Sequence, residues 1–260
     1  MIRGTWSLSE PLVPANISAI MVKMGQEKGI SQDSLLENTE IDPAAFSDPK
    51  ALLTYQQVII LINNMLKLCN EPTLGLELGN AININQFGML GYAILSCANI
   101  RQALNLGLKY HVLIDPAFNF EVVEQEDITS IRLTSHIPIE NIYNLICDIF
   151  LANFISLGRY LTGLDVMPIA ININRTKPEF FEKYQNYFPN CPVNWDQPRT
   201  EILINTHILD APTTLADEAT AKMAESQCAD ILTRMGPREG IVVKVRRILL
   251  SNPGQYPPIE

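Results

Sequence analysis

The stretch from Gly88 to Asp115, GMLGYAILSCANIRQALNLGLKYHVLID, constrains the fold more than any other part of the chain. It predicts two consecutive helices with a break near Ser96–Asn99. In the second helix, apolar positions recur at the spacing of one helical face. This stripe consists of Ile100, Ala103, Leu104, Gly107, Leu108 and His111, and the other side carries Arg101, Gln102, Asn105 and Lys109. Since the ionisable His111 lies on the apolar stripe, the helix pair is a core element and a candidate wall of a ligand site.

The overall composition is that of a soluble globular protein, with 47% hydrophobic and 18% charged residues in a chain of 260. A net charge of −9 argues against a broad nucleic-acid-binding face, because phosphate binding needs clustered Lys and Arg. It is compatible with a small basic element at one end. The five cysteines are far apart and never in C-x-x-C spacing, so free thiols are expected and a zinc site is not.

A cytoplasmic location is expected from two segments. The N-terminal residues MIRGTWSLSEPLVPA contain no apolar run typical of a secretory signal. The most apolar run, Ile139 to Leu164, contains Glu140, Asp148, Asn153 and Arg159, so spanning a bilayer with it would be costly. No membrane association is predicted.

Helical periodicity dominates the first part of the chain. It predicts a helix over about 15–28 and a short helix that begins after a Ser31 cap and includes Leu35 and Leu36. A long helix is expected from its N-cap Thr54 to Cys69, and another over 73–82. Residues 40–50 are rich in turn signals. The helix pair of Gly88–Asp115 comes next.

The period then changes from helical to alternating. Residues 118–123 and 128–133 predict a β-hairpin. Residues 139–161 predict a helix that is apolar on most of its circumference, with Asn153 as an unusual polar residue on its core side. A strand over 165–174, a helix over 177–188, a strand pair at 193–195 and 200–205, a helix over 217–235 and a short basic helix complete the chain. The class is therefore α+β, a helix-rich domain with a small antiparallel β-sheet packed against buried helices.

Several segments together resemble one family, the AraC/XylS-type transcription regulators. They are Gly29-Ile30 before Leu35-Leu36, EPTLGL at 71–76, GMLGYA at 88–93, and Asn99-Ile100 followed by Ala103-Leu104 and Tyr110. The set is similar to the arabinose-binding-like N-terminal sensor domain, in the subgroup that includes ornithine-utilisation regulators. Asn99 stands where this subgroup has Thr at a helix N-cap, which is a conservative change.

The resemblance implies two parts. Residues 1–235 would be an effector-sensing and dimerisation domain, and 236–260 a linker with the first helix of a helix-turn-helix domain that is largely missing from this chain. DNA would be bound only through that missing domain, by a homodimer. Lys244, Arg246 and Arg247 would then lie near DNA phosphates. On spacing alone, basic residues near a helix C-terminus also complement the helix dipole.

The chain contains no recognisable catalytic motif, so no enzyme activity, cofactor or metal is predicted. A nucleophilic site around Cys147 would have to assemble in space. An effector pocket is expected between the hairpin sheet and the helices that cover it. Its candidate polar residues are Tyr92, His111, Arg132, Asn153 and Asn172.

Three of these candidates have a structural alternative. His111 could be a core histidine bonded to a backbone carbonyl, Arg132 could face solvent, and Asn153 could make a structural hydrogen bond. Three functions remain open: a sensor domain of a transcription regulator, a stand-alone small-molecule or partner-binding module, and an enzyme with a spatially assembled site.

Overall fold

The computed structural model describes residues 10–115, 118–135, 142–165 and 167–234. Its helices are α1 (Ala15–Glu27), α2 (Gln32–Leu35), α3 (Tyr55–Leu68), α4 (Leu74–Ala81), α5 (Gly88–Leu95), α6 (Ile100–Tyr110), α7 (Tyr143–Thr162), α8 (Glu182–Tyr187) and α9 (Glu218–Arg234). Its strands are β1 (Pro11–Pro14), β2 (Leu52–Thr54), β3 (Phe118–Gln125), β4 (Ile128–Ser135), β5 (Ala170–Asn172), β6 (Val193–Asn194) and β7 (Glu201–Asn205). Short 3-10 turns are η1 (Pro43–Ser47), η2 (Ile84–Phe87), η3 (His111–Leu113) and η4 (Thr206–Asp210). The α+β class is confirmed.

The main sheet has five strands in the order β3-β4-β7-β5-β6. The predicted hairpin is confirmed as β3 and β4, whose register pairs Phe120 with Leu133. The predicted strand pair near 193–205 is wrong, because β6 and β7 both pair with β5, on opposite sides of it. The β5–β6 pairing is parallel, so the sheet is mixed. Alternation along a strand indicates which residues share a face but not which strand pairs with it. The pairing of β5 with β6 and β7 could therefore not be predicted from the sequence.

Most of the predicted helices are confirmed, including the break between α5 and α6 and the Thr54 cap of α3. Thr54 and Gln57 form a reciprocal capping box at the start of α3. The helix expected over 177–188 is shorter, because turns with i→i+3 hydrogen bonds, such as Phe181 N–H to Pro178 O, precede α8. The strand expected over 165–174 is likewise reduced to the three residues of β5.

Helix α7 is the central helix of the fold, and α4 packs closely against it. Two glycines of α4 make this approach possible: a Cβ on Gly75 would lie 2.7 Å from Leu145 O, and one on Gly79 would lie 2.5 Å from Ile149 O. By length and composition α7 could cross a membrane, but more than half of its apolar window is buried within the fold. Its apolar character is thus accounted for by packing, as in the core helix of a soluble protein.

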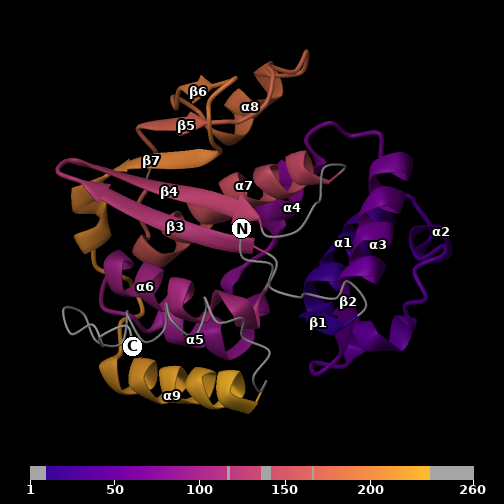
Figure 1. The fold of residues 1–260 in the computed structure, drawn as a ribbon, viewed down its shortest axis with the longest axis horizontal. Coiled ribbons are helices and arrows are strands. Elements are labelled where there is room, and N and C mark those ends of the chain that lie inside the picture. Colours follow the sequence, from indigo (N-terminus) through magenta and orange to yellow (C-terminus); the bar gives the residue numbers. More distant parts are fainter. Residues whose placement is uncertain (1–9, 116–117, 136–141, 166, 235–260) are drawn as a thin grey trace, which may run out of the picture.

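The helices lie in layers around the sheet (Figure 1). In this view α6 and α5 lie beneath the β3–β4 hairpin, and α9 forms the base by packing on α5. The helices α1 to α3, with the two-stranded sheet of β1 and β2, form a flank beside this body. A single core runs through the layers, from Leu61 and Ile62 in α3 to Leu151 in α7 and Ile202 in β7.

Candidate functional site

A cavity of about 280 Å³ lies between one face of the five-stranded sheet and the helices that cover it. Its location agrees with the predicted pocket, and its volume is close to the lower end of the range of ligand sites, ~300–1,000 Å³. Strand alternation supplies the sheet wall, which consists of Phe118, Phe120, Val122, Ile131, Leu133, Ile202 and Ile204. Helices α1 and α3 close the cavity with Ile17, Met21, Val58, Ile59 and Ile62.

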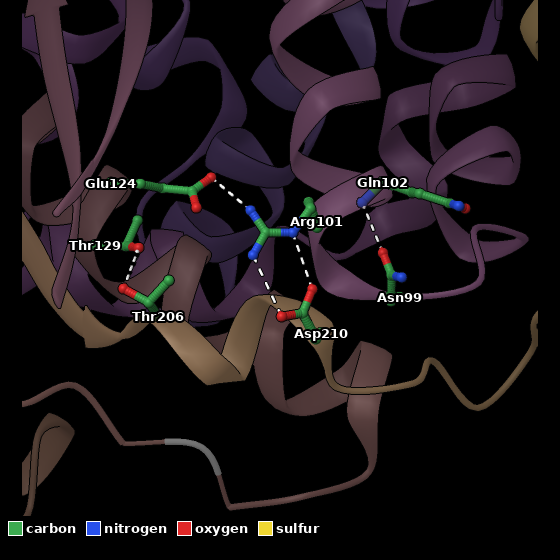
Figure 2. A network of polar contacts seen from close by, with 7 residues as sticks. All are labelled: Asn99, Arg101, Gln102, Glu124, Thr129, Thr206 and Asp210. Carbon is green, nitrogen blue, oxygen red and sulfur yellow. Dashed lines mark hydrogen bonds and ion pairs between the residues drawn. The ribbon is translucent and has the colours of Figure 1, made fainter. Parts of the chain in front are cut away.

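Helix α6 forms another wall with the stripe that its sequence predicts. All six stripe residues, Ile100, Ala103, Leu104, Gly107, Leu108 and His111, line the cavity. The opposite side of the helix is held by ion pairs (Figure 2): Arg101 Nη1 lies 2.6 Å from Glu124 of β3, and Arg101 Nε lies 2.9 Å from Asp210 of η4. These two carboxylates raise the pKa of Arg101. The wall is therefore held by ion pairs on its outer side, and its inner side is apolar except for His111.

An aromatic cluster forms the inner side of the cavity where β3 meets α7. The ring centroids of Phe120 and Phe154 are 5.1 Å apart, and those of Phe150 and Phe154 are 4.8 Å apart. The His111 ring meets Phe120 edge-on at 6.3 Å. Such tilted and edge-to-face arrangements are the favoured geometries of aromatic pairs. The cluster gives this side of the cavity an aromatic surface.

His111 lines the cavity, and its ring is partly committed to the protein. Nδ1 lies 2.9 Å from the carbonyl oxygen of Leu108. Because a carbonyl only accepts, Nδ1 carries the proton in this contact. The structural interpretation of His111, a histidine bonded to a backbone carbonyl, is confirmed. The same residue also belongs to the cavity wall, where a bound ligand would contact it.

Asn153 also lines the cavity, and its amide closes the end of α4. Its Nδ2 donates to Gly79 O at 3.0 Å and to Ile82 O at 2.6 Å. The last carbonyls of a helix lack partners within the helix, so this amide caps α4 from a neighbouring element. The structural reading of Asn153 is therefore confirmed. The other polar atom of this side chain is Oδ1, which is a hydrogen-bond acceptor.

Two further polar residues of the cavity, Tyr55 and Asp115, were missed in the sequence. The Tyr55 hydroxyl donates a hydrogen bond to the Asp115 carboxylate. Tyr55 is the first residue of α3 and Asp115 follows η3, so 60 positions separate them. No local pattern brings such residues together. The available signal was only that each lies at the end of an amphipathic element.

Residues 29–213 match the sequence profile described as the arabinose-binding domain of AraC transcription regulators, N-terminal. The match covers more than half of the chain. The chain belongs to the AraC-type transcription regulators. This confirms the family that the short motifs predict, and residues 29–213 contain most of the cavity wall.

Relatives of this AraC-type chain include the ornithine utilization regulator of Pseudomonas aeruginosa, 28% identical over 96% of the chain and 73% of the relative. An uncharacterized HTH-type transcriptional regulator of Mycobacterium tuberculosis is 22% identical over 94% of the chain and 72% of its own length. Among solved structures, the transcriptional regulator CdpR from Pseudomonas aeruginosa has a TM-score of 0.61 at 15% identity, covering 92% of this chain and 71% of CdpR. That likeness shows a shared fold.

Three of the five candidate polar residues of the AraC-type domain do not line the cavity. Tyr92 is 58% exposed on α5. Arg132 and Asn172 lie on the other face of the sheet, where both contact Glu201: Arg132 Nε at 3.0 Å and Asn172 Nδ2 at 2.9 Å. Arg132 is thus held by an ion pair rather than free in solvent. The structure brings His111 and Asn153 to the cavity and leaves the other three outside it.

The chemistry around Cys147 does not suit a nucleophile in the AraC-type domain. Cys147 is buried in α7, and burial raises the pKa of its thiol. Its neighbour Asp148 accepts hydrogen bonds from Arg175 Nη2 and the Tyr184 hydroxyl, both at 2.8 Å. This buried network ties α7 to the β5–α8 segment.

The residues predicted to lie near DNA, Lys244, Arg246 and Arg247, fall outside the described residues. The same holds for the whole proposed segment 236–260. Their role stays a prediction.

Proposed function

We propose that this chain is the effector-sensing part of an AraC-type regulator, and that its cavity binds a small molecule. The observation that carries the proposal is the enclosure of the cavity by elements distant in sequence. α1, α3, α6, α7 and the sheet all contribute to its wall. A ligand that fills this space contacts every layer of the domain, so its binding favours one arrangement of the layers over others.

The proposal extends to the organisation of the regulator. Residues 1–235 sense the effector and support a homodimer, and 236–260 lead into a DNA-binding domain. In this arrangement DNA is contacted through that second domain, with Lys244, Arg246 and Arg247 close to the phosphates. The protein acts in the cytoplasm without a catalytic step. The family match and the regulators among its relatives support this organisation.

The test uses the protein encoded by the complete gene. Its binding to the promoter regions flanking that gene is measured by fluorescence anisotropy, with and without compounds that raise the melting temperature of the 260-residue chain. A ligand that prefers the native state raises this temperature by mass action. Specific DNA binding that changes with such a compound is the expected result. A complete protein without specific DNA binding contradicts the proposal.

The alternative is a stand-alone small-molecule or partner-binding module. It predicts ligand binding with no effect on DNA. The family match favours the regulator, and the same anisotropy experiment separates the two.

A further inference from the structure

The lining of the cavity is mostly apolar. Among its described residues, the polar side chains are Ser18, Tyr55, His111, Asp115, Asn153 and Thr162, and neither Lys nor Arg occurs. Most of their hydrogen-bonding groups already have partners in the protein: Tyr55 donates to Asp115, and Thr162 Oγ1 donates to Gly158 O at 2.8 Å. A buried charge needs a partner, and a buried hydroxyl needs a hydrogen bond. A sugar or a free amino acid would find too few of either.

Two glycines inside helices face the same cavity. Gly107 lies in the middle of α6 and Gly158 in α7, and both line the wall. Glycine is unfavourable inside a helix, so its presence calls for a reason. Neither residue has a positive φ angle. Among the described residues, a Cβ on Gly107 would meet only Ile94 Cδ1 at 3.8 Å, and one on Gly158 would meet nothing within 4 Å.

Close packing therefore does not explain these two glycines, unlike Gly75 and Gly79 of α4, where a Cβ would strike the backbone of α7. What Gly107 and Gly158 provide is space. A larger side chain at either position would extend over the cavity wall. This observation is independent of the polarity of the lining, and it points to an occupant of the same space.

We propose that the cavity takes an uncharged, mainly hydrocarbon ligand with a single hydroxyl group, of the class of a long-chain alcohol, and that Gly107 and Gly158 keep the space for it. The inference rests on the proposed function, since it names the chemistry of the effector. The described lining residues include no Lys or Arg that could pair with a ligand carboxylate, and burying an unpaired charge is costly. Asn153 donates both of its amide hydrogens to the protein, so its remaining group, Oδ1, suits a ligand that donates a hydrogen bond.

The test measures melting temperatures of the 260-residue chain with 1-alkanols from hexanol to dodecanol, and with decanoate, L-arabinose and L-ornithine as comparisons. An alcohol at about 100 times its Kd should raise the melting temperature by roughly 5–10 °C. Decanoate at neutral pH, arabinose and ornithine should leave it unchanged.

Cavity-filling variants show whether binding occurs at this site. Gly107→Leu and Gly158→Leu should keep or raise the melting temperature of the ligand-free chain, because leucine is the better helix residue. Both should abolish the shift caused by the alcohol. Asn105→Leu is the matched control, since it adds the same side chain to an exposed position of α6. It should bind the alcohol as the unaltered chain does.

Three outcomes would overturn the inference: no alcohol shifts the melting temperature, decanoate or arabinose shifts it as much, or Gly107→Leu and Gly158→Leu retain the shift. Failure of the proposed function has a different result. In that case the alcohol binds and the leucine variants block it, but the complete protein shows no DNA binding that responds to it.

Discussion

Replacing Asn153 with alanine should destabilise the chain by about 3 kcal/mol, because this side chain satisfies two buried carbonyl groups at once. Its Nδ2 donates to Gly79 O and to Ile82 O, at the C-terminal end of α4. The last turn of α4 contains no basic residue that could substitute for it. Asn153 itself is 8% exposed, so water does not readily replace the lost donor.

The magnitude follows from the two acceptors. A buried group left without its hydrogen bond costs roughly 1–3 kcal/mol, so two cost about 2–6 kcal/mol. Alanine is the better helix residue and offsets about 0.6 kcal/mol of this. A net loss near 3 kcal/mol lowers the melting temperature of a chain of this size by roughly 6–12 °C.

The assay is urea unfolding followed by circular dichroism, with Asn144→Ala as the control. Asn144 is exposed on the same helix, α7, so its replacement should change the free energy of unfolding by no more than about 0.5 kcal/mol. If Asn153→Ala unfolds within that margin of the unaltered chain and with the same denaturant slope, the amide does not cap α4. The hydrogen-bond reasoning would then be refuted.

Three other predictions concern packing, pH and thiols. Gly79→Val should destabilise the chain by more than about 2 kcal/mol, because its Cβ would lie 2.5 Å from Ile149 O. Gly158→Ala should stabilise the chain by about 0.5–1 kcal/mol, because alanine is the better helix residue. Urea unfolding measures both changes. Burial raises the pKa of Asp148 to about 6, so the native state holds a proton that the unfolded state releases near pH 4. The free energy of unfolding, relative to Asp148→Asn, should therefore fall by roughly 2 kcal/mol as pH rises from 4 to 7, and a flat difference would contradict this. The five cysteines are free and buried, and burial raises the pKa of Cys97, Cys191 and Cys228 to about 11. Ellman's reagent should therefore label these thiols only after unfolding. Rapid labelling of the native chain would contradict the packing described above.

The sequence predicts those parts of the fold that depend on local periodicity. The α6 stripe is an example, because residues spaced three and four apart share a helical face whatever surrounds them. The capping box of Thr54 is another, since its partners lie within one turn. The parallel pairing of β5 with β6 joins two strands whose connection contains α8, and no local pattern specifies this pairing.

The same distinction explains the outcome for the site. His111 and Asn153 could be identified because each is a polar residue on an apolar helical face. Arg132 shows the limit of the alternating pattern. Its neighbours Ile131 and Leu133 face the cavity, so Arg132 lies on the other face of the sheet. Tyr92 belongs to a helix that is apolar all round, where periodicity does not indicate the exposed side. The Tyr55–Asp115 pair needed the tertiary structure.

An occupant of the cavity should slow hydrogen exchange in α9, because α6 connects the two. One face of α6 lines the cavity, and Lys109 on its other side forms an ion pair of 2.7 Å with Glu225 of α9. Helix α9 also packs on α5. The segment that leads into α9 is bonded to the end of α5, because the backbone N–H of Asp217 donates to Ser96 O and that of Thr213 to Ala98 O. A ligand that restricts α6 restricts these contacts as well. Hydrogen–deuterium exchange with and without 1-decanol, in the unaltered chain and in Gly107→Leu, measures this directly. If decanol binds and protects α6 while exchange in α9 stays unchanged, the cavity communicates with the rest of the regulator by another route.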